Sequence, residues 1–361
     1  LNAGLQALFA AGARQAEGGE FTRRAFLNGR LDLLQAEAVV DLIDAETSEA
    51  ARHAAAQLSG TLSRAVEGVY EDLLSLMSRF YAVVDYPDED IADLEKGESL
   101  DTLRRSRVRL EELLASFSRG QVVKNGVPTV LLGKPNVGKS SLLNALLGYE
   151  RAIVTDIAGT TRDTVEEKLP LGRVLLRLTD TAGLRDSDDT VEMLGVERSR
   201  AAAAKASLAL LVLDGSAPMD EEDEEAAALS ESARHTVAVV NKSDLPCCLD
   251  LDALRRRFDM VVPISAKEGS GIKGLCEILE GLYSDAPAAA GEMLTNARQA
   301  AAVERALRAV EAAEESLLKD MTPDVVLTET EQAMEALNEL TGKHVRDDLV
   351  EAIFSRFCVG K

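Results

Sequence analysis

The amino-acid sequence predicts a bundle of helices together with one α/β unit that has a mostly parallel sheet. Apolar residues recur every three or four positions over residues 31–84, which places them on one face of a helix. From Val122 the pattern changes to short apolar runs alternating with helical stretches, as a parallel sheet with crossover helices requires. Helical spacing returns after residues 285–287. The two helical regions are either separate domains or one bundle split by an insertion.

Gly60 and the pair Tyr86-Pro87 divide the first helical region, and a further helix is predicted over about residues 98–119. Beyond the α/β unit, long amphipathic helices are predicted over residues 294–319 and 323–340. A last helix over residues 345–357 leads to the tail Cys358-Val359-Gly360-Lys361. Because the ends of an α/β domain often emerge close together, the pattern is compatible with insertion.

The octapeptide Gly133 to Ser140 reads GKPNVGKS and matches the phosphate-loop pattern G-x-x-x-x-G-K-[ST]. An apolar run, Val127 to Leu132, enters it, and a helix-like run, 141–147, leaves it. Its glycines let backbone N–H groups curl around phosphates, and the helix points its positive end at the same anion. Lys139 is therefore expected to reach the β/γ-phosphates, and the Ser140 hydroxyl to ligate Mg²⁺.

Two further motifs follow predicted strands. Residues 175–179 alternate like a strand and end in Asp180-Thr181-Ala182-Gly183, where the acid can hold Mg²⁺ through water and the Gly183 N–H can follow a γ-phosphate. The apolar strand 237–240 runs into Asn241-Lys242-Ser243-Asp244. The Asp244 carboxylate can accept both N1–H and N2–H₂ of guanine, and adenine offers neither donor.

A fourth predicted strand, residues 260–264, precedes Ser265-Ala266-Lys267, which would close over the guanine base. Together the motifs predict a Ras-like P-loop GTPase domain. The residues expected to contact GTP are Asn136, Val137, Gly138, Lys139, Ser140, Ser141, Thr155, Asp156, Ile157, Ala158, Gly159, Thr160, Thr161, Asp180, Thr181, Ala182, Gly183, Asn241, Lys242, Ser243, Asp244, Ser265, Ala266 and Lys267.

The segment 155–163 has the position of a switch loop ordered by γ-phosphate and Mg²⁺, with Thr161 as the second hydroxyl ligand of Mg²⁺. The alternative is a Thr-rich surface loop. The catalytic groups are less usual, because Leu184 stands where many GTPases have a water-orienting glutamine. Glu192 is a candidate substitute or an acid in the first turn of a helix. Asn136 could coordinate a monovalent cation in place of an arginine.

Composition limits the class of protein. Asp and Glu number 62 against 40 Lys and Arg, and this net charge of −22 disfavours non-specific nucleic-acid binding. The basic clusters 104–109 and 255–257 are interpreted as solvated helix faces, and the acidic run 220–225 as a solvent-exposed loop entering a helix. Four cysteines without metal or disulfide spacing indicate a reducing, cytoplasmic location, with no membrane span.

The chain resembles the MnmE (TrmE) family of tRNA-modification GTPases. The resemblance is carried by Asn136, Leu184, Glu192, the switch loop and the two terminal segments, Gly19 to Asp32 and Phe357 to Lys361. It implies a helical bundle split by an inserted G domain. The implied domains are a folate-domain remnant over 1–30, a first helical part over 31–121, the G domain over 122–286, and a second helical part with the tail over 287–361.

The resemblance also implies residue roles. Asn136 and the backbone of Thr155, Ile157 and Thr160 would hold K⁺, Glu192 would orient water, and Asn136, Glu192 and Lys139 would be catalytic. A reduced folate, 5-formyl- or 5,10-methylene-tetrahydrofolate, would be bound by Arg30, which replaces the family's lysine, and by Lys361. Cys358 is either a terminal thiol or a functional one beside the folate. Because the chain opens Leu1-Asn2-Ala3, without methionine, we expect an N-terminally truncated chain with an incomplete folate site.

The implied activity is K⁺-stimulated hydrolysis of GTP that drives 5-carboxymethylaminomethyl (aminomethyl-type) modification of the wobble uridine, U34, in certain tRNAs. The implied partners are a second copy of the chain, the flavoprotein MnmG (GidA), and tRNA held largely by that flavoprotein. The alternative is a regulatory ribosome-assembly GTPase of the Era or Der type, which would need a basic RNA-binding module.

Overall fold

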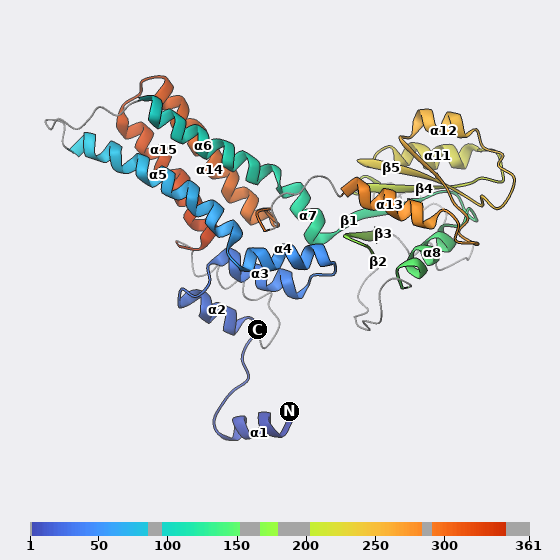
Figure 1. Ribbon diagram of the computed structural model, residues 1–361, viewed down its shortest axis with the longest axis horizontal. Helices are drawn as coiled ribbons and strands as arrows, with labels where there is room; N and C mark the ends of the chain where they lie inside the picture. Colours follow the sequence, from blue (N-terminus) through green and yellow to red (C-terminus); the bar gives the residue numbers. More distant parts are fainter. Residues whose placement is uncertain (1, 86–95, 152–166, 180–202, 284–290, 344–361) are drawn as a thin grey trace. The chain divides into compact units, whose positions relative to one another are not determined.

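The computed structural model describes residues 2–85, 96–151, 167–179, 203–283 and 291–343. The chain divides into two compact units. The helical unit comprises residues 1–45, 50–124 and 287–361, and the sheet unit comprises residues 46–49 and 125–286. Figure 1 labels most of the helices and strands of both units.

The helical unit is built mainly from helices that precede and follow the sheet unit in the sequence. These are α1 (Asn2–Ala10), α2 (Glu20–Leu27), α3 (Leu33–Ile43), α4 (Ser48–Leu58), α5 (Thr61–Asp85), α6 (Lys96–Ala115), α7 (Phe117–Asn125), α14 (Ala297–Leu318) and α15 (Pro323–Thr341). Side chains define several ends: Asp32 and Gln35 form a capping box at α3, and Pro323 begins α15. Among the described residues, no helix combines the length and apolarity needed to cross a membrane.

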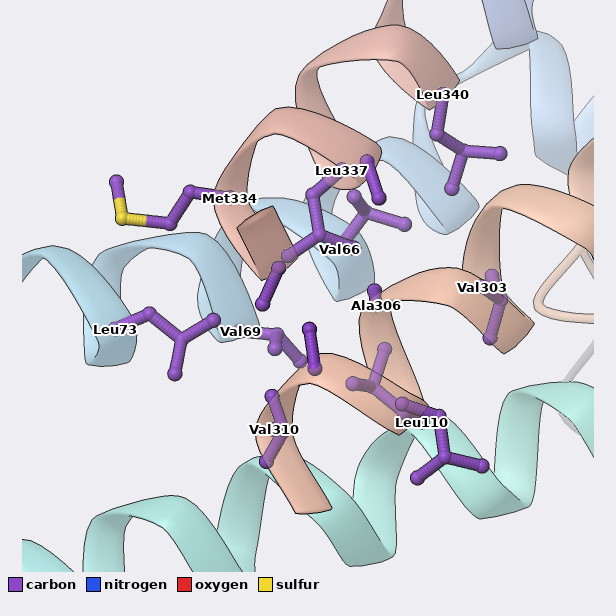
Figure 2. Close-up of a cluster of buried hydrophobic side chains, with 14 of the residues drawn as sticks. Val66, Val69, Leu73, Leu110, Val303, Ala306, Val310, Met334, Leu337 and Leu340 are labelled. Carbon is purple, nitrogen blue, oxygen red and sulfur yellow. The ribbon is translucent and has the colours of Figure 1, made fainter. Parts of the chain in front are cut away.

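One hydrophobic core joins the early and late helices of this unit. Figure 2 shows side chains of α5, α6, α14 and α15 meeting in it, among them Val69, Leu110, Val310 and Leu337. Each of these four is at most 3% exposed. Apolar residues spaced at three and four positions give each helix one buried stripe, so the four helices pack around a shared centre. The predicted helical regions before and after the α/β unit are confirmed within the described residues, and the last predicted helix, residues 345–357, lies outside them.

The single helix predicted over residues 98–119 is instead two helices, α6 and α7. Between them, the Ser116 hydroxyl donates to the Leu113 carbonyl at 2.5 Å, and the Ser116 N–H is shared between two carbonyls of the preceding turn. A serine that bonds back to the helix in this way competes with regular helical hydrogen bonding. Helix α7 also runs to Asn125, so the predicted change of pattern at Val122 is too early.

Among the described residues, the sheet unit contains one six-stranded sheet in the order β2-β3-β1-β4-β5-β6. The strands are β1 (Val127–Leu132), β2 (Glu167–Leu171), β3 (Val174–Thr179), β4 (Leu208–Asp214), β5 (His235–Asn241) and β6 (Met260–Pro263). All neighbours pair in parallel except β2 and β3. The predicted mostly parallel sheet is confirmed.

Four helices of the sheet unit are α8 (Lys139–Arg151), α11 (Glu221–Ser230), α12 (Leu251–Arg257) and α13 (Ile272–Tyr283). The central strand β4 is buried along residues 208–213, as a parallel strand covered on both faces should be. Loops after the carboxyl ends of β1, β4, β5 and β6 lie at one edge of the sheet, where open α/β sheets bind ligands.

The acidic run 220–225, predicted as a solvent-exposed loop entering a helix, is exposed except at Asp223, but helix α11 begins already at Glu221. Asp220 is already the N-cap of α11, and it forms a capping box with Asp223. Acidic residues are favoured there because the positive end of the helix dipole attracts them. Asp223 is only 3% exposed, so one acid of this run is buried inside the sheet unit.

Candidate nucleotide-binding site

The phosphate loop connects β1 to α8 through a backbone path that only glycine can follow at two points. Gly133 has φ 140°, and an added Cβ would lie 2.3 Å from the Val212 carbonyl oxygen. Gly138 has φ 99°, and its Cβ would lie 2.2 Å from Asn241 Nδ2. A side chain at either position would fill the space or distort the turn. The loop therefore has the open backbone that phosphate binding requires.

Helix α8 begins at Lys139, within the last two residues of the phosphate-loop octapeptide, so its N-terminal N–H groups face the region that the loop encloses. The Lys139 ammonium donates to the carbonyl oxygens of Gly133 and, at 2.9 Å, Lys134. Burial lowers the pKa of Lys139, because a desolvated ammonium loses hydration. A phosphate group would supply the negative charge that this half-buried lysine lacks. Ser140 and Ser141 are exposed at the start of α8.

Asn241, at the end of β5, joins the loop to the base-binding motifs. Its Nδ2 donates to the Val137 carbonyl at 2.8 Å, and its Oδ1 accepts from the Ala266 N–H at 3.0 Å. Asn241 is 3% exposed, and a buried amide that satisfies both ends is costly to replace. One side chain therefore brings the three predicted motifs around residues 137, 241 and 266 into contact.

The guanine-recognition residue Asp244 is exposed and accepts a hydrogen bond at 2.6 Å from the Ser265 hydroxyl. This hydrogen bond lowers the pKa of the Asp244 carboxyl. The Asp244 carboxylate is therefore oriented and ionised before any guanine base binds. The Ser243 N–H donates to the Ile264 carbonyl at 2.9 Å, which holds the segment after β5 against the segment after β6. Lys267 is exposed nearby in the sequence.

Asp214, at the end of β4, is a site residue that the sequence analysis missed. The Lys242 ammonium, on a residue with φ 64°, donates to Asp214 Oδ2 at 2.5 Å, and the Ser216 hydroxyl donates to Oδ1 at 2.6 Å. Burial raises the pKa of Asp214, but these hydrogen bonds outweigh burial and the pKa lies below its ordinary value. The sequence contained a signal for Asp214, because this acid also ends an apolar strand, the same feature that identified Asp180 as a candidate.

Part of the predicted site lies outside the described residues. This applies to the switch residues Thr155 to Thr161, the motif Asp180 to Gly183, Leu184, Glu192, Cys358 and Lys361. Of the two predicted folate-binding residues, Arg30 is described: it is exposed, and its N–H donates to the Ala25 carbonyl at 2.8 Å just beyond α2.

The two arginine clusters are partly neutralised by acidic neighbours. Arg104 and Arg107 both contact Glu314, and Arg109 contacts Glu292. Arg257 bridges two glutamates of the α11 region. Ion-paired guanidinium groups of this kind belong to helix faces and offer little net charge to phosphates, which agrees with the sequence interpretation.

The cysteines behave as small apolar or loop residues. Cys276 is buried in α13, where burial raises the pKa of its thiol to about 11. Cys247 and Cys248 are exposed and unpaired by disulfides.

The strand–loop–helix around Lys139, the tether through Asn241 and the oriented carboxylate of Asp244 define a P-loop protein of the G-domain class. A family model described as the MnmE helical domain matches residues 33–358. A "tRNA modification GTPase MnmE" from Heliobacterium modesticaldum is 44% identical over 368 residues, covering 99% of this chain and 78% of that protein. The chain belongs to the MnmE family.

The chain is also similar to a second MnmE protein and to a solved G domain. A "tRNA modification GTPase MnmE" from Natranaerobius thermophilus is 40% identical over 361 residues, which is 99% of this chain and 79% of that protein. Among solved structures, the G domain of the T. maritima FeoB iron transporter is 24% identical and covers 44% of this chain and 98% of that chain, with a TM-score of 0.32.

Proposed function

We propose that this chain is a K⁺-stimulated GTPase that hydrolyses GTP to GDP and phosphate. Hydrolysis would drive 5-carboxymethylaminomethyl-type modification of U34 in certain tRNAs. The observation that carries the proposal is the 44% identity to a relative named a tRNA modification GTPase, because it spans 99% of this chain and so includes both units. The geometry of the phosphate loop and of Asp244 supports guanine nucleotides as the ligand.

The described residues fit a GTP·Mg²⁺ ligand. Glycine at positions 133 and 138 leaves space that a Cβ would fill, and the half-buried Lys139 ammonium, which has no carboxylate partner among the described residues, suits a phosphate. Ser140, with Thr161 from the switch loop, would hold Mg²⁺, which neutralises charge on the phosphates. Lys139 would orient the β/γ-phosphates, and Glu192 would orient the attacking water.

For K⁺, the supporting observation is Asn136. It is exposed on the phosphate loop and has φ 63°, a backbone conformation that asparagine tolerates better than most residues. Its amide oxygen, with backbone oxygens of Thr155, Ile157 and Thr160, would hold the ion. The ion supplies the positive charge that an arginine provides in other GTPases.

The cation proposal predicts that the rate of GTP hydrolysis falls several-fold when NaCl replaces KCl at equal ionic strength. Na⁺ is smaller and would be poorly coordinated by oxygens spaced for K⁺. Steady-state phosphate release in the two salts measures this effect, and Asn136→Ala should remove most of the difference. Equal rates in both salts would contradict the role of Asn136.

The proposed assembly is a homodimer in which an inserted G domain, residues 122–286, is carried by a helical domain formed from residues 31–121 and 287–361. The shared core of α5, α6, α14 and α15 supports a single helical domain. The net charge of −22 supports a partner, the flavoprotein MnmG (GidA), that holds most of the tRNA. A reduced folate would meet Arg30, Lys361 and, beside them, Cys358.

The deciding experiment combines the chain with the flavoprotein. Co-purification of the two proteins, followed by mass spectrometry of U34 in tRNA incubated with GTP, K⁺, flavin and reduced folate, should detect both a complex and the modified base. Matched reactions with GDP should give no modification. GTP hydrolysis without flavoprotein binding or U34 modification would instead favour a ribosome-assembly GTPase of the Era or Der type.

A further inference from the structure

Lys134, the second residue of the phosphate loop, is anchored by two aspartates of another element. Its ammonium lies 2.5 Å from Asp220 Oδ2 and 2.6 Å from Asp223 Oδ2, at the first turn of α11. The Lys134 side chain is 16% exposed and that of Asp223 only 4%. Hydrogen bonds from the ammonium to Asp220 and Asp223 raise the pKa of Lys134, so it stays protonated at neutral pH.

Asp220 and Asp223 are also held in place by hydrogen bonds to each other's backbone at the start of α11. The Asp223 N–H donates to Asp220 Oδ1 at 3.1 Å, and the Asp220 N–H donates to Asp223 Oδ2 at 3.3 Å, which completes the capping box of α11. Asp223 Oδ1 is buried and has no hydrogen-bond partner among the described residues. A buried carboxylate with one oxygen unsatisfied depends strongly on its single cation. Lys134 therefore supplies the positive charge that compensates for burial of the Asp223 carboxylate.

The backbone of the same residue touches the lysine expected to bind phosphate. The Lys134 carbonyl oxygen accepts from Lys139 Nζ at 2.9 Å. A continuous path thus runs from buried Asp223, through the Lys134 side chain and carbonyl, to the Lys139 ammonium. Because α11 fixes one end of this path, the second residue of the loop cannot shift without breaking a buried ion pair.

A purely structural interpretation is that the ion pair only attaches α11 to the sheet. Two features argue against it. First, the ion pair joins α11 to the phosphate loop itself and not to a strand or another helix. Second, the backbone carbonyl of Lys134 accepts a hydrogen bond from the Lys139 ammonium. A side chain that acts through another in this way preorganises a site.

We infer that Lys134, held between Asp220 and Asp223, is a positioning residue that sets the phosphate loop and Lys139 for nucleotide binding. This inference rests on the proposed GTPase function. It assigns to α11 a part in GTP affinity.

The test measures GTP affinity with a fluorescent GTP analogue, together with KM and kcat for hydrolysis. Lys134→Met keeps the aliphatic stem and removes the charge, and we expect it to raise the Kd and KM for GTP about tenfold, the scale of a lost buried charged contact. Lys134→Arg keeps a positive charge beside the two carboxylates and should retain affinity to within about threefold of wild type. A general folding defect would lower the active fraction without changing KM.

A double-mutant cycle separates positioning from independent effects. Asp223→Asn should also weaken GTP binding, and the double variant with Lys134→Met should lose about as much as Lys134→Met alone, since contacting residues are not additive. The matched control is Arg257→Met. Arg257 also bridges two carboxylates, Glu224 and Glu231 at 2.6 and 2.8 Å, but these partners belong to α11 and its C-terminal end and not to the phosphate loop, so GTP affinity should not change.

Two results would overturn the inference: GTP affinity within about twofold of wild type in Lys134→Met, or an equal loss in Arg257→Met. If Lys134→Met does not fold, Asp223→Asn and Lys134→Arg carry the same comparison. Failure of the proposed function has a different signature. If the wild-type chain binds GTP without hydrolysing it, the proposed function fails, but the ratios of Kd between variants and wild type still decide the role of Lys134. If the wild-type chain binds no GTP, both the proposed function and this inference are overturned.

Discussion

Asp244→Asn should change the base preference of the chain from guanine to xanthine nucleotides. The Asp244 carboxylate can accept the N1–H and N2–H₂ of guanine together, whereas an asparagine amide presents one acceptor and one donor. Xanthine has a carbonyl in place of the guanine amino group and so fits the amide. Loss of two charge-assisted hydrogen bonds should raise the Kd for GTP about 10³-fold, while the Kd for xanthosine triphosphate falls.

Competition between the two nucleotides for a fluorescent guanine analogue measures this change. Asp250→Asn is the matched control, because Asp250 is the N-cap of α12 in the same connection and asparagine caps helices equally well. Since the Ser265 hydrogen bond lowers the pKa of Asp244, the carboxylate is ionised at every pH above the ordinary aspartate pKa of about 3.9. The wild-type preference for guanine should therefore persist as the pH is lowered from neutral toward that value. A variant that still prefers GTP would contradict the assignment of Asp244.

Gly138→Ala should disable the phosphate loop. An alanine would have to adopt φ 99° and would place its Cβ 2.2 Å from Asn241 Nδ2. The Asn241 side chain would then have to move, which breaks its hydrogen bonds to Val137 and Ala266. We expect the Kd for GTP to rise at least about 10²-fold and the free energy of unfolding of the sheet unit to fall by about 2–3 kcal/mol.

Isothermal titration with GTP and urea unfolding check these two effects. Gly148→Ala is the control in the adjoining helix α8, because nothing lies within 4 Å of its added Cβ. In a helix interior that change should stabilise the chain by up to about 1 kcal/mol and leave GTP affinity unchanged. Wild-type affinity in Gly138→Ala would show that the tight junction with Asn241 is not needed for binding.

Local pattern was sufficient for several parts of this molecule. The first strand was predicted over Val127 to Leu132, and it is found there. The phosphate loop and the motif at Asn241 were also recognised, because each consists of a strand followed directly by a turn of fixed composition. Such segments carry their structural signal in neighbouring residues. The division of residues 98–119 into two helices was missed, since a serine that breaks a helix looks the same in sequence as one that does not.

Contacts between distant residues could not be predicted in the same way. Asp214 was not recognised as the partner of Lys242, and Asp223, in the acidic run at Asp220, was expected to be solvent-exposed. Lys134 and Asp223 are 89 residues apart, and no periodicity links them. Whether an acid is buried or solvated depends on which cation the fold brings to it.

The sequence by itself determined the class of ligand, because phosphate and guanine recognition are encoded in short contiguous motifs whose backbone needs glycine and whose side chains need specific charges. It also indicated the strands β1, β3, β5 and β6 and the long helices on either side of the α/β unit, whereas β2 and β4 were not predicted. Only the tertiary structure decided that α5 and α6 share one core with α14 and α15, and that α11 anchors the phosphate loop through Lys134. Packing and ion pairing join residues that are far apart in the chain, and these contacts exist only after the chain has folded.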